Sequence, residues 1–175
     1  MQYQAYGDDF LSKKYIRLND CLKENRWREA DQETDKLISR VIGKEIENSV
    51  VEDFQDFPCN HLLTIDKLWV RYSNGHFGFS IQKEIYIDFG GRFQTYNGKL
   101  TSFMNNDDQD AWNKFIHKVG WIKQKPTEVI ATEVIYDIHR APKGHLPYWY
   151  NKARFAFFLG VFYRIDQCKN NISIS

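Results

Sequence analysis

The stretch from Asp56 to Gly91 constrains the fold of this 175-residue chain more than any other part of the sequence. It combines apolar side chains, aromatic rings and turn-forming residues at a density that the rest of the chain does not reach. Full burial of one large apolar side chain contributes about 1.5–3 kcal/mol. A surface loop would leave this stabilising area exposed to water, so we expect the stretch to form the centre of a single core.

The secondary structure of residues 58–81 has two interpretations. Apolar residues at helical spacing favour a helix that ends near Tyr72, with Asn60 or Thr64 as its N-cap, and a second helix that begins near Phe79. The alternative is a β-hairpin, because strand-forming residues flank an Asn-Gly turn. Propensity alone favours the hairpin, and periodicity cannot separate the two over such short runs.

Two amphipathic helices are predicted before this stretch, over residues 10–24 and 27–42. Gly43 follows the second helix, in the position where glycine commonly ends a helix. The two would form a short antiparallel hairpin of the kind found in helical repeat proteins. The sequence contains no second copy of this unit, so a repeat array is not supported.

The second half of the chain carries weaker signals. Acidic residues at the start of 108–119 suit a helix dipole and predict a helix there. Residues 121–138 are rich in β-branched side chains, which favours extended structure, with a helix from Thr127 as the alternative. Residues 141–147 are a turn-rich loop, and residues 169–175 are expected to be a polar tail.

The composition argues against several classes of protein. A formal net charge of +1 gives no basic stripe, so we expect no nucleic-acid partner. No apolar run approaches the roughly 20 residues that span a bilayer, and the first residues lack the features of a signal peptide. The chain is therefore expected to be soluble. Cys21, Cys59 and Cys168 are isolated and odd in number, which predicts reduced thiols.

Catalytic and metal sites find little support. Cys59, His61 and Asp66 could act as nucleophile, base and orienting group, but residues two apart on a helix point away from each other. We therefore expect these residues to be structural. The histidines are scattered singly, without the spacing that metal ligands need on one element, so no metal site is predicted.

The aromatic segment after residue 147 suits a flat, acidic ligand. Tyr148 and Trp149 offer apolar surface beside Arg154, so the rings could cover a planar ligand while the guanidinium pairs its carboxylates. The alternative is a buried helix over 155–162, with Arg154 and Arg164 reaching solvent at its edges.

Several longer motifs carry a family resemblance. They are DFPCNHLLTIDKLWVRYSNGHFGFSIQKEIY from Asp56, WREADQET at 27–34, VGW at 119–121, APKGHLP at 141–147 and RIDQC at 164–168. Taken in the order in which they occur along the chain, they resemble the genomes-uncoupled-four family of tetrapyrrole-binding regulators. The resemblance implies a mainly α fold, a single compact all-helical domain with a concave "cupped hand" face. It favours the helical interpretation of 58–81, with a lead-in over 1–9 and the domain over 10–168.

The resemblance also implies a function. The family is non-enzymatic, binds protoporphyrin IX or Mg-protoporphyrin IX, and stimulates magnesium chelatase in chlorophyll biosynthesis. The implied partner is the large porphyrin-binding subunit of the chelatase, for a monomer with peripheral membrane contact. The implied location is the chloroplast stroma, with the protein encoded in the plastid, or a cyanobacterial cytoplasm. A bilin carrier or sensor, and a protein-interaction scaffold with an unused pocket, are the alternatives.

Carried onto this chain, the family's binding surface comes from residues 50–57 and 148–158, which we call the first and second binding segments. The arginines would pair with propionates. The expected ligand-binding residues are Leu37, Val41, Val51, Phe54, Phe57, Tyr148, Trp149, Arg154, Phe157 and Arg164.

Overall fold

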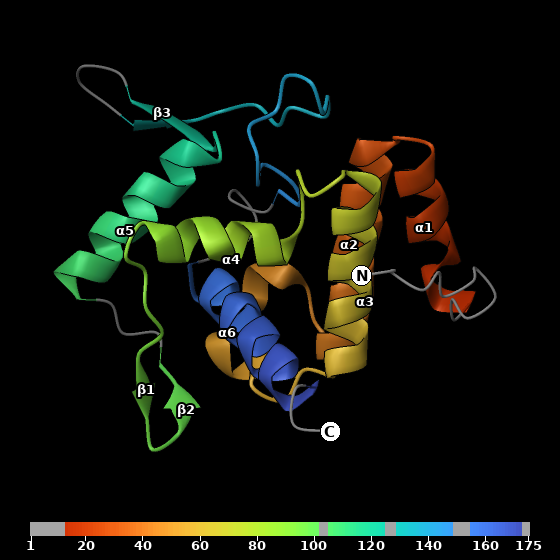
Figure 1. Cartoon of the computed structure of the whole chain (residues 1–175). Coiled ribbons are helices and arrows are strands. Elements are labelled where there is room, and N and C mark those ends of the chain that lie inside the picture. Colours follow the sequence, from red (N-terminus) through yellow and green to blue (C-terminus); the bar gives the residue numbers. More distant parts are fainter. Residues whose placement is uncertain (1–12, 102–104, 125–128, 149–154, 173–175) are drawn as a thin grey trace, which may run out of the picture.

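Helices α1 (Ile16–Lys23), α2 (Trp27–Ile42) and α3 (Cys59–Tyr72) pack together on one side of the molecule (Figure 1). The computed structural model describes residues 13–101, 105–124, 129–148 and 155–172. In this part of the chain the fold is mostly helical, which confirms the mainly α class. No helix within it combines the length and the hydropathy that a membrane crossing requires.

The first two helices form the predicted antiparallel hairpin. A short 3₁₀ helix, η2 (Lys13–Tyr15), precedes α1, and residues 10–12 of the predicted helix lie outside the described residues. The bounds of α2 agree with the prediction, and Gly43 ends it with φ of 73°. Helix α3 is bonded to this hairpin: the Trp69 indole Nε1–H of α3 donates to the Thr34 hydroxyl of α2 over 2.9 Å. This bond fixes α3 against α2.

Residues 59–72 and the start of the next helix at Phe79 are helical, so the helical interpretation is confirmed and the β-hairpin is wrong. The turn after α3 has positive φ at Asn74 and Gly75. The next helix, α4 (Phe79–Asp88), begins where the Ser80 N–H donates to the Asp66 carboxylate over 2.8 Å. Local propensity favoured a hairpin here, but the Asp66 carboxylate on α3 caps the start of α4. This is a tertiary contact that local propensity does not include.

The predicted N-cap of α3 is also wrong. The helix begins at Cys59 after Pro58, which occupies the N-cap position without a side-chain cap. Proline has no N–H and its φ is already fixed near the helical value, so it is well tolerated at a helix start. Asn60 and Thr64 lie within the helix, where the Thr64 hydroxyl donates back to the Asn60 carbonyl over 2.6 Å.

Helices α4, α5 (Asn106–Lys118) and α6 (Phe155–Ile172) form the other side of the fold. Helix α6 lies beneath α4 in Figure 1 and packs against α3, α4 and the 3₁₀ helix η4 (Val51–Phe54). The aromatic core lies between these helices, where the rings of Tyr86, Phe115 and Phe162 approach one another at centroid distances of 5.8–6.2 Å. The central stretch supplies α3 and α4, and so contributes to both sides of the fold.

Two short antiparallel hairpins accompany the helices. Strands β1 (Thr95–Tyr96) and β2 (Lys99–Leu100) pair with each other, as do β3 (Ile122–Gln124) and β4 (Val129–Ala131). The extended interpretation of residues 121–138 is therefore confirmed for β3 and β4, and the alternative helix is wrong from Val129 onwards. Thr127, where that helix would begin, lies outside the described residues.

Helix α5 begins slightly earlier than predicted. Its Asn105 side chain accepts from the Asp108 N–H over 2.8 Å, and the Asp108 carboxylate accepts from the Asn105 N–H. One of the acidic residues that favoured this helix thus caps it directly. The last helix, α6, continues to Ile172, past the residue where the polar tail is expected to begin.

The prediction of reduced thiols is wrong for two of the three cysteines. A disulfide joins Cys59 at the start of α3 to Cys168 in α6, with their Cα atoms 5.4 Å apart. The two cysteines are 109 residues apart in sequence, and only the packing of α3 against α6 brings them together. Cys21 is a free, buried thiol, as predicted.

Candidate functional site

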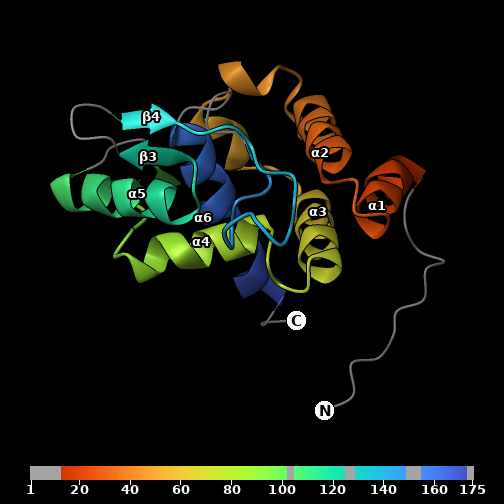
Figure 2. The same cartoon turned by 90° about the horizontal axis from the view of Figure 1, so that it is seen from above.

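The two binding segments meet at α6. The first contains η4, which packs against α6, and the described end of the second forms the first turn of α6. Between β4 and the second segment, the chain runs towards α2 and α3 and then turns back (Figure 2). The structure therefore brings together segments that lie about a hundred positions apart in the sequence.

Asp31 of α2 ties this returning chain to the N-terminal hairpin. Its carboxylate accepts the backbone N–H of Tyr148 over 2.8 Å and the hydroxyl of Tyr136 over 3.1 Å. The side chain is buried, and the Arg28 guanidinium lies 4.8 Å from the centre of the Tyr136 ring. Burial and the neighbouring Asp31 carboxylate raise the pKa of the Tyr136 phenol, which therefore remains a donor. Asp31 thus holds the residue at which the second binding segment begins.

The aromatic residues of the predicted site form a packed layer between η4 and α6. The Phe54 ring stacks on Phe57 at a centroid distance of 5.7 Å and meets Phe157 edge-on at 5.0 Å. All three rings and the Val51 side chain are buried. Gly160 of α6 faces the Phe54 ring, and a Cβ added to this glycine would come within 2.8 Å of it. These residues hold the first binding segment on α6, and their contact with a ligand stays a prediction.

The other predicted apolar residues differ in exposure. Leu37 and Tyr148 are buried, and the Tyr148 hydroxyl donates to the Thr132 carbonyl over 3.3 Å. Val41, near the end of α2, is only partly buried and packs against the core. Trp149 and Arg154 lie outside the described residues.

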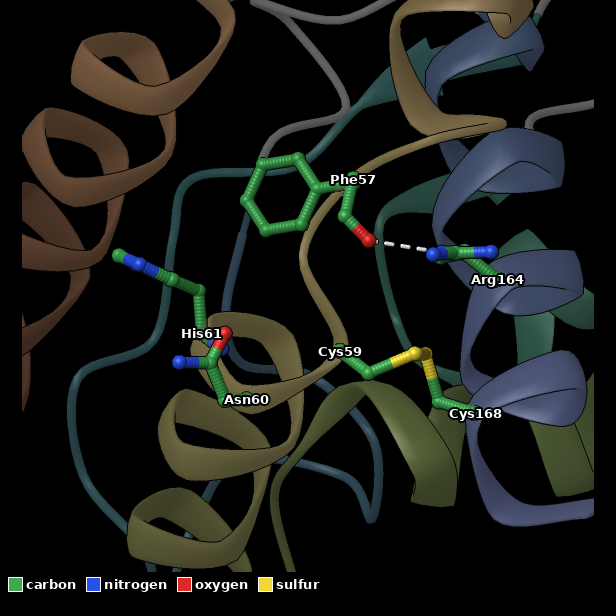
Figure 3. The surroundings of a disulfide bond; sticks show 6 residues. All are labelled: Phe57, Cys59, Asn60, His61, Arg164 and Cys168. Carbon is green, nitrogen blue, oxygen red and sulfur yellow. Dashed lines mark hydrogen bonds between the residues drawn. A yellow bond between two sulfur atoms is a disulfide. The ribbon is translucent and has the colours of Figure 1, made fainter. Parts of the chain in front are cut away.

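Arg164 connects α6 to the end of the first binding segment. Its Nε–H donates to the Phe57 carbonyl over 2.7 Å, one turn of α6 before Cys168 (Figure 3). The side chain is partly exposed. The bond gives Arg164 a defined structural role, and its pairing with a propionate stays a prediction.

His145, which the sequence analysis did not single out, organises the APKGHLP loop from inside the core. Its Nδ1–H donates to the Val119 carbonyl over 2.7 Å, and its Nε2 accepts the Ile135 N–H over 3.0 Å. The acceptor role of Nε2 requires the neutral ring, and burial lowers the pKa of this imidazole. The Trp121 indole also donates to the His145 carbonyl over 2.8 Å. The loop therefore fixes the chain that leads to the second binding segment.

Cys59, His61 and Asp66 make separate structural contacts. Cys59 is in the disulfide, and Figure 3 shows the His61 ring pointing away from its sulfur. The His61 Nε2 accepts from the Lys14 ammonium over 2.8 Å, and Asp66 caps α4. Burial raises the pKa of the Asp66 carboxyl. Among the described residues, no group of three or more His, Cys, Asp or Glu side chains could hold a metal ion.

The sequence profile of the GUN4-like family matches residues 10–158. The chain belongs to the GUN4-like family. Ligand-free GUN4 of Arabidopsis thaliana has a similar structure, with a TM-score of 0.66 and 21% identity over 86% of this chain and 92% of that one. GUN4 of Chlamydomonas reinhardtii has a TM-score of 0.61 and 26% identity over 93% and 96% of the two chains. The GUN4-like fold is thereby confirmed.

Curated relatives of this GUN4-like chain come from a plant, from algae and from the cyanobacterium Synechocystis. The chloroplastic tetrapyrrole-binding protein of Arabidopsis thaliana is 26% identical over 141 residues, which cover 74% of this chain and 46% of the relative. The ycf53 protein of Cyanidium caldarium is 29% identical over 154 residues, which cover 86% and 56%. The chain thus spans about half the length of these relatives.

The residues that sequence reasoning missed are the polar ones that position the site. Asp31 lies four residues after Trp27 and three before Thr34, on the apolar face of α2. A carboxylate on such a face needs buried partners, and this signal could have identified Asp31. No comparable local signal identifies His145, because its partners come from two other stretches of the chain, 119–121 and Ile135.

Proposed function

We propose that this GUN4-like chain binds a porphyrin and acts as a regulator without catalysing a reaction. The observation that carries the proposal is the family match over residues 10–158. The Arabidopsis relative, which is named a tetrapyrrole-binding protein, supports it. The meeting of the two binding segments at α6 supports it further, because a large planar ligand needs contacts from more than one element.

The ligand we propose is protoporphyrin IX or its magnesium form. Its ring would lie against the two binding segments and the partly buried Val41, with the buried layer around Phe54 as a rigid support. Its two propionates would pair with arginines, for which Arg154 and Arg164 are the candidates. Paired guanidinium groups would fix the orientation of the ring, since charged hydrogen bonds are directional.

The partner we propose is the large porphyrin-binding subunit of magnesium chelatase, which this chain would stimulate as a monomer. The location would be the chloroplast stroma or a cyanobacterial cytoplasm. Relatives from Arabidopsis chloroplasts and from Synechocystis support this placement. Peripheral membrane contact and the domain bounds of 10–168 are further parts of the proposal.

Titration with protoporphyrin IX tests the binding step. We expect a shift of the porphyrin absorption band and quenching of tryptophan fluorescence at micromolar ligand. A parallel titration with the bilin biliverdin serves as the comparison. No spectral change up to the solubility limit would contradict porphyrin binding, and tighter binding of biliverdin would favour a bilin carrier.

A chelatase assay tests the regulatory step. Purified magnesium chelatase is supplied with protoporphyrin IX and magnesium, with and without this chain. We expect faster formation of Mg-protoporphyrin IX when the chain is present. An unchanged rate, from a chain that binds the porphyrin, would contradict the regulatory role and leave the binding role intact.

A further inference from the structure

Two ties join α6 to the chain around the start of α3, and we call them the clasp. One is the disulfide between Cys59 and Cys168, and the other is the hydrogen bond from Arg164 Nε–H to the Phe57 carbonyl (Figure 3). Cys59 is the first residue of α3 and Cys168 lies near the end of α6. Only the disulfide can be broken and reformed by electron transfer.

The clasp is connected to both binding segments through α6 and Phe57. Phe57 is the last residue of the first segment, and the second segment ends in the first turn of α6. The same helix packs against η4 of the first segment. Whatever changes the position or mobility of α6 relative to α3 therefore acts on both segments at once.

The two sulfur-bearing residues differ in access to solvent. Cys168 is buried, with 1% of its surface exposed, whereas Cys59 is partly exposed in the first turn of α3. The first turn of a helix favours a thiolate through its unpaired N–H groups and its dipole. A reductant can thus reach Cys59 first, and the reduced Cys59 would be the reactive thiolate of the pair.

We propose that Cys59 and Cys168 form a thiol–disulfide exchange site whose partner is a dithiol reductant. We further propose that its redox state sets the affinity for porphyrin, a part that rests on the proposed function. In a compartment kept reducing by thiols, a disulfide is typically transient and regulatory. The location proposed for this chain is such a compartment.

The exchange is a balanced two-electron step. A thiolate of the reductant attacks the Cys59 sulfur, the bond between the two cysteine sulfurs breaks, and Cys168 leaves as a thiolate that takes a proton from solvent. The second thiol of the reductant then attacks the reductant sulfur that is bonded to Cys59 in the mixed disulfide, and Cys59 is released as a thiol. The protein gains two electrons and two protons, and the dithiol leaves as a disulfide.

Reduction would loosen the clasp without removing it. The disulfide closes a loop of 109 residues, and a long closed loop restricts the unfolded chain strongly. Without it, the hydrogen bond from Arg164 remains, together with the aromatic layer between η4 and α6. The two binding segments would then be ordered less firmly before the ligand arrives, and binding would have to order them.

The first experiment follows the thiols of the wild-type chain in its native state. Protein oxidised with diamide is incubated without denaturant in millimolar dithiothreitol, quenched with acid, freed of reductant, labelled with maleimide in urea and analysed by mass spectrometry. We expect two more maleimide groups than in protein that was not treated with dithiothreitol, and a melting temperature about 10 °C lower. A pair that dithiothreitol reduces only in urea, or that diamide does not oxidise, would overturn the exchange site.

The second experiment measures protoporphyrin IX affinity in the two redox states. We expect the oxidised chain to bind at least about fivefold tighter, at the lower end of usual coupling between sites. The variant with Cys59→Ser and Cys168→Ser should bind like the reduced chain and ignore dithiothreitol. The control Cys21→Ser, at the free buried thiol of α1, should keep the redox response.

The outcomes separate the two proposals. Equal affinity in both states, in a chain that binds porphyrin, would overturn the redox control of binding. Absence of porphyrin binding in both states would overturn the proposed function and, with it, the control of affinity. The thiol count would still decide the exchange site by itself.

Discussion

The hydroxyl of Tyr136 donates a hydrogen bond to the carboxylate of Asp31 across a sequence separation of 105 residues. The same carboxylate accepts the backbone N–H of Tyr148. One buried side chain on α2 therefore fixes both the extended chain after β4 and the start of the second binding segment. The arrangement is polar but lies inside the core, so its contribution to stability and to binding can be measured separately.

Substitution of Asp31→Asn should lower the free energy of unfolding by about 1.5–3 kcal/mol. The amide keeps one acceptor oxygen, but its NH2 group cannot accept a hydrogen bond from the second donor. Urea unfolding measures the loss, and protoporphyrin IX titration should show weaker binding. Tyr136→Phe removes one donor, and a double-mutant cycle gives the coupling of the pair. A coupling energy near zero would show that this hydrogen bond does not hold the segment.

Substitution of Gly160→Ala should destabilise the protein by about 1–3 kcal/mol, the usual effect of overpacking a core. Alanine in a helix interior normally stabilises relative to glycine by about 1 kcal/mol. Here the new Cβ would lie 2.8 Å from the Phe54 ring, so the sign should be reversed. Chemical denaturation measures the change.

A second substitution tests the cause. With Phe54→Leu already present, the smaller side chain leaves room, and Gly160→Ala should then be neutral or stabilising. If Gly160→Ala lowers the free energy of unfolding equally in both backgrounds, contact with the Phe54 ring is not the cause of the destabilisation.

Acidification should destabilise the fold through His145. Burial lowers the pKa of this imidazole in the folded protein, so below about pH 6.5, the ordinary value for histidine, the unfolded chain binds more protons than the folded one. Stability is therefore complete above that pH and decreases below it, by up to about 1.4 kcal/mol per pH unit for one such group. Melting temperatures between pH 8 and pH 5 measure the slope.

Two variants identify the group responsible. The pKa of His61 is also lowered, by burial and by the charge of Lys14, so His61→Gln gives the share of this second imidazole. His139 is exposed, and His139→Gln is the control for replacing a surface histidine by glutamine. If His61→Gln removes the whole slope, the prediction for His145 is wrong.

Local sequence signals predicted much of the fold, but not the buried polar contacts that position the binding segments. Helix α2 was predictable because its apolar spacing and Gly43 are both local. The pairing of Cys59 with Cys168 was not, since it exists only after α3 packs against α6. In the site, the family resemblance marked Phe54 as a ligand contact, and the structure shows its ring buried against α6. Apolar character alone does not distinguish a side chain that supports a binding surface from one that forms it.

Arg164 could act on a porphyrin in two ways, and the ligand itself can separate them. Its guanidinium could pair with a propionate, or its Nε could act only through the Phe57 carbonyl that it binds at 2.7 Å. Arg164→Gln should weaken protoporphyrin IX binding by about 1.5–3 kcal/mol, roughly 10- to 150-fold, if a charged pair is lost. Titration with protoporphyrin IX dimethyl ester, which has the same ring without the carboxylates, is the matched measurement. Direct pairing requires that the variant and the wild type bind the ester equally well. An equal loss for the acid and the ester would instead mean that Arg164 only positions the end of the first binding segment, and that the propionates find their cation elsewhere.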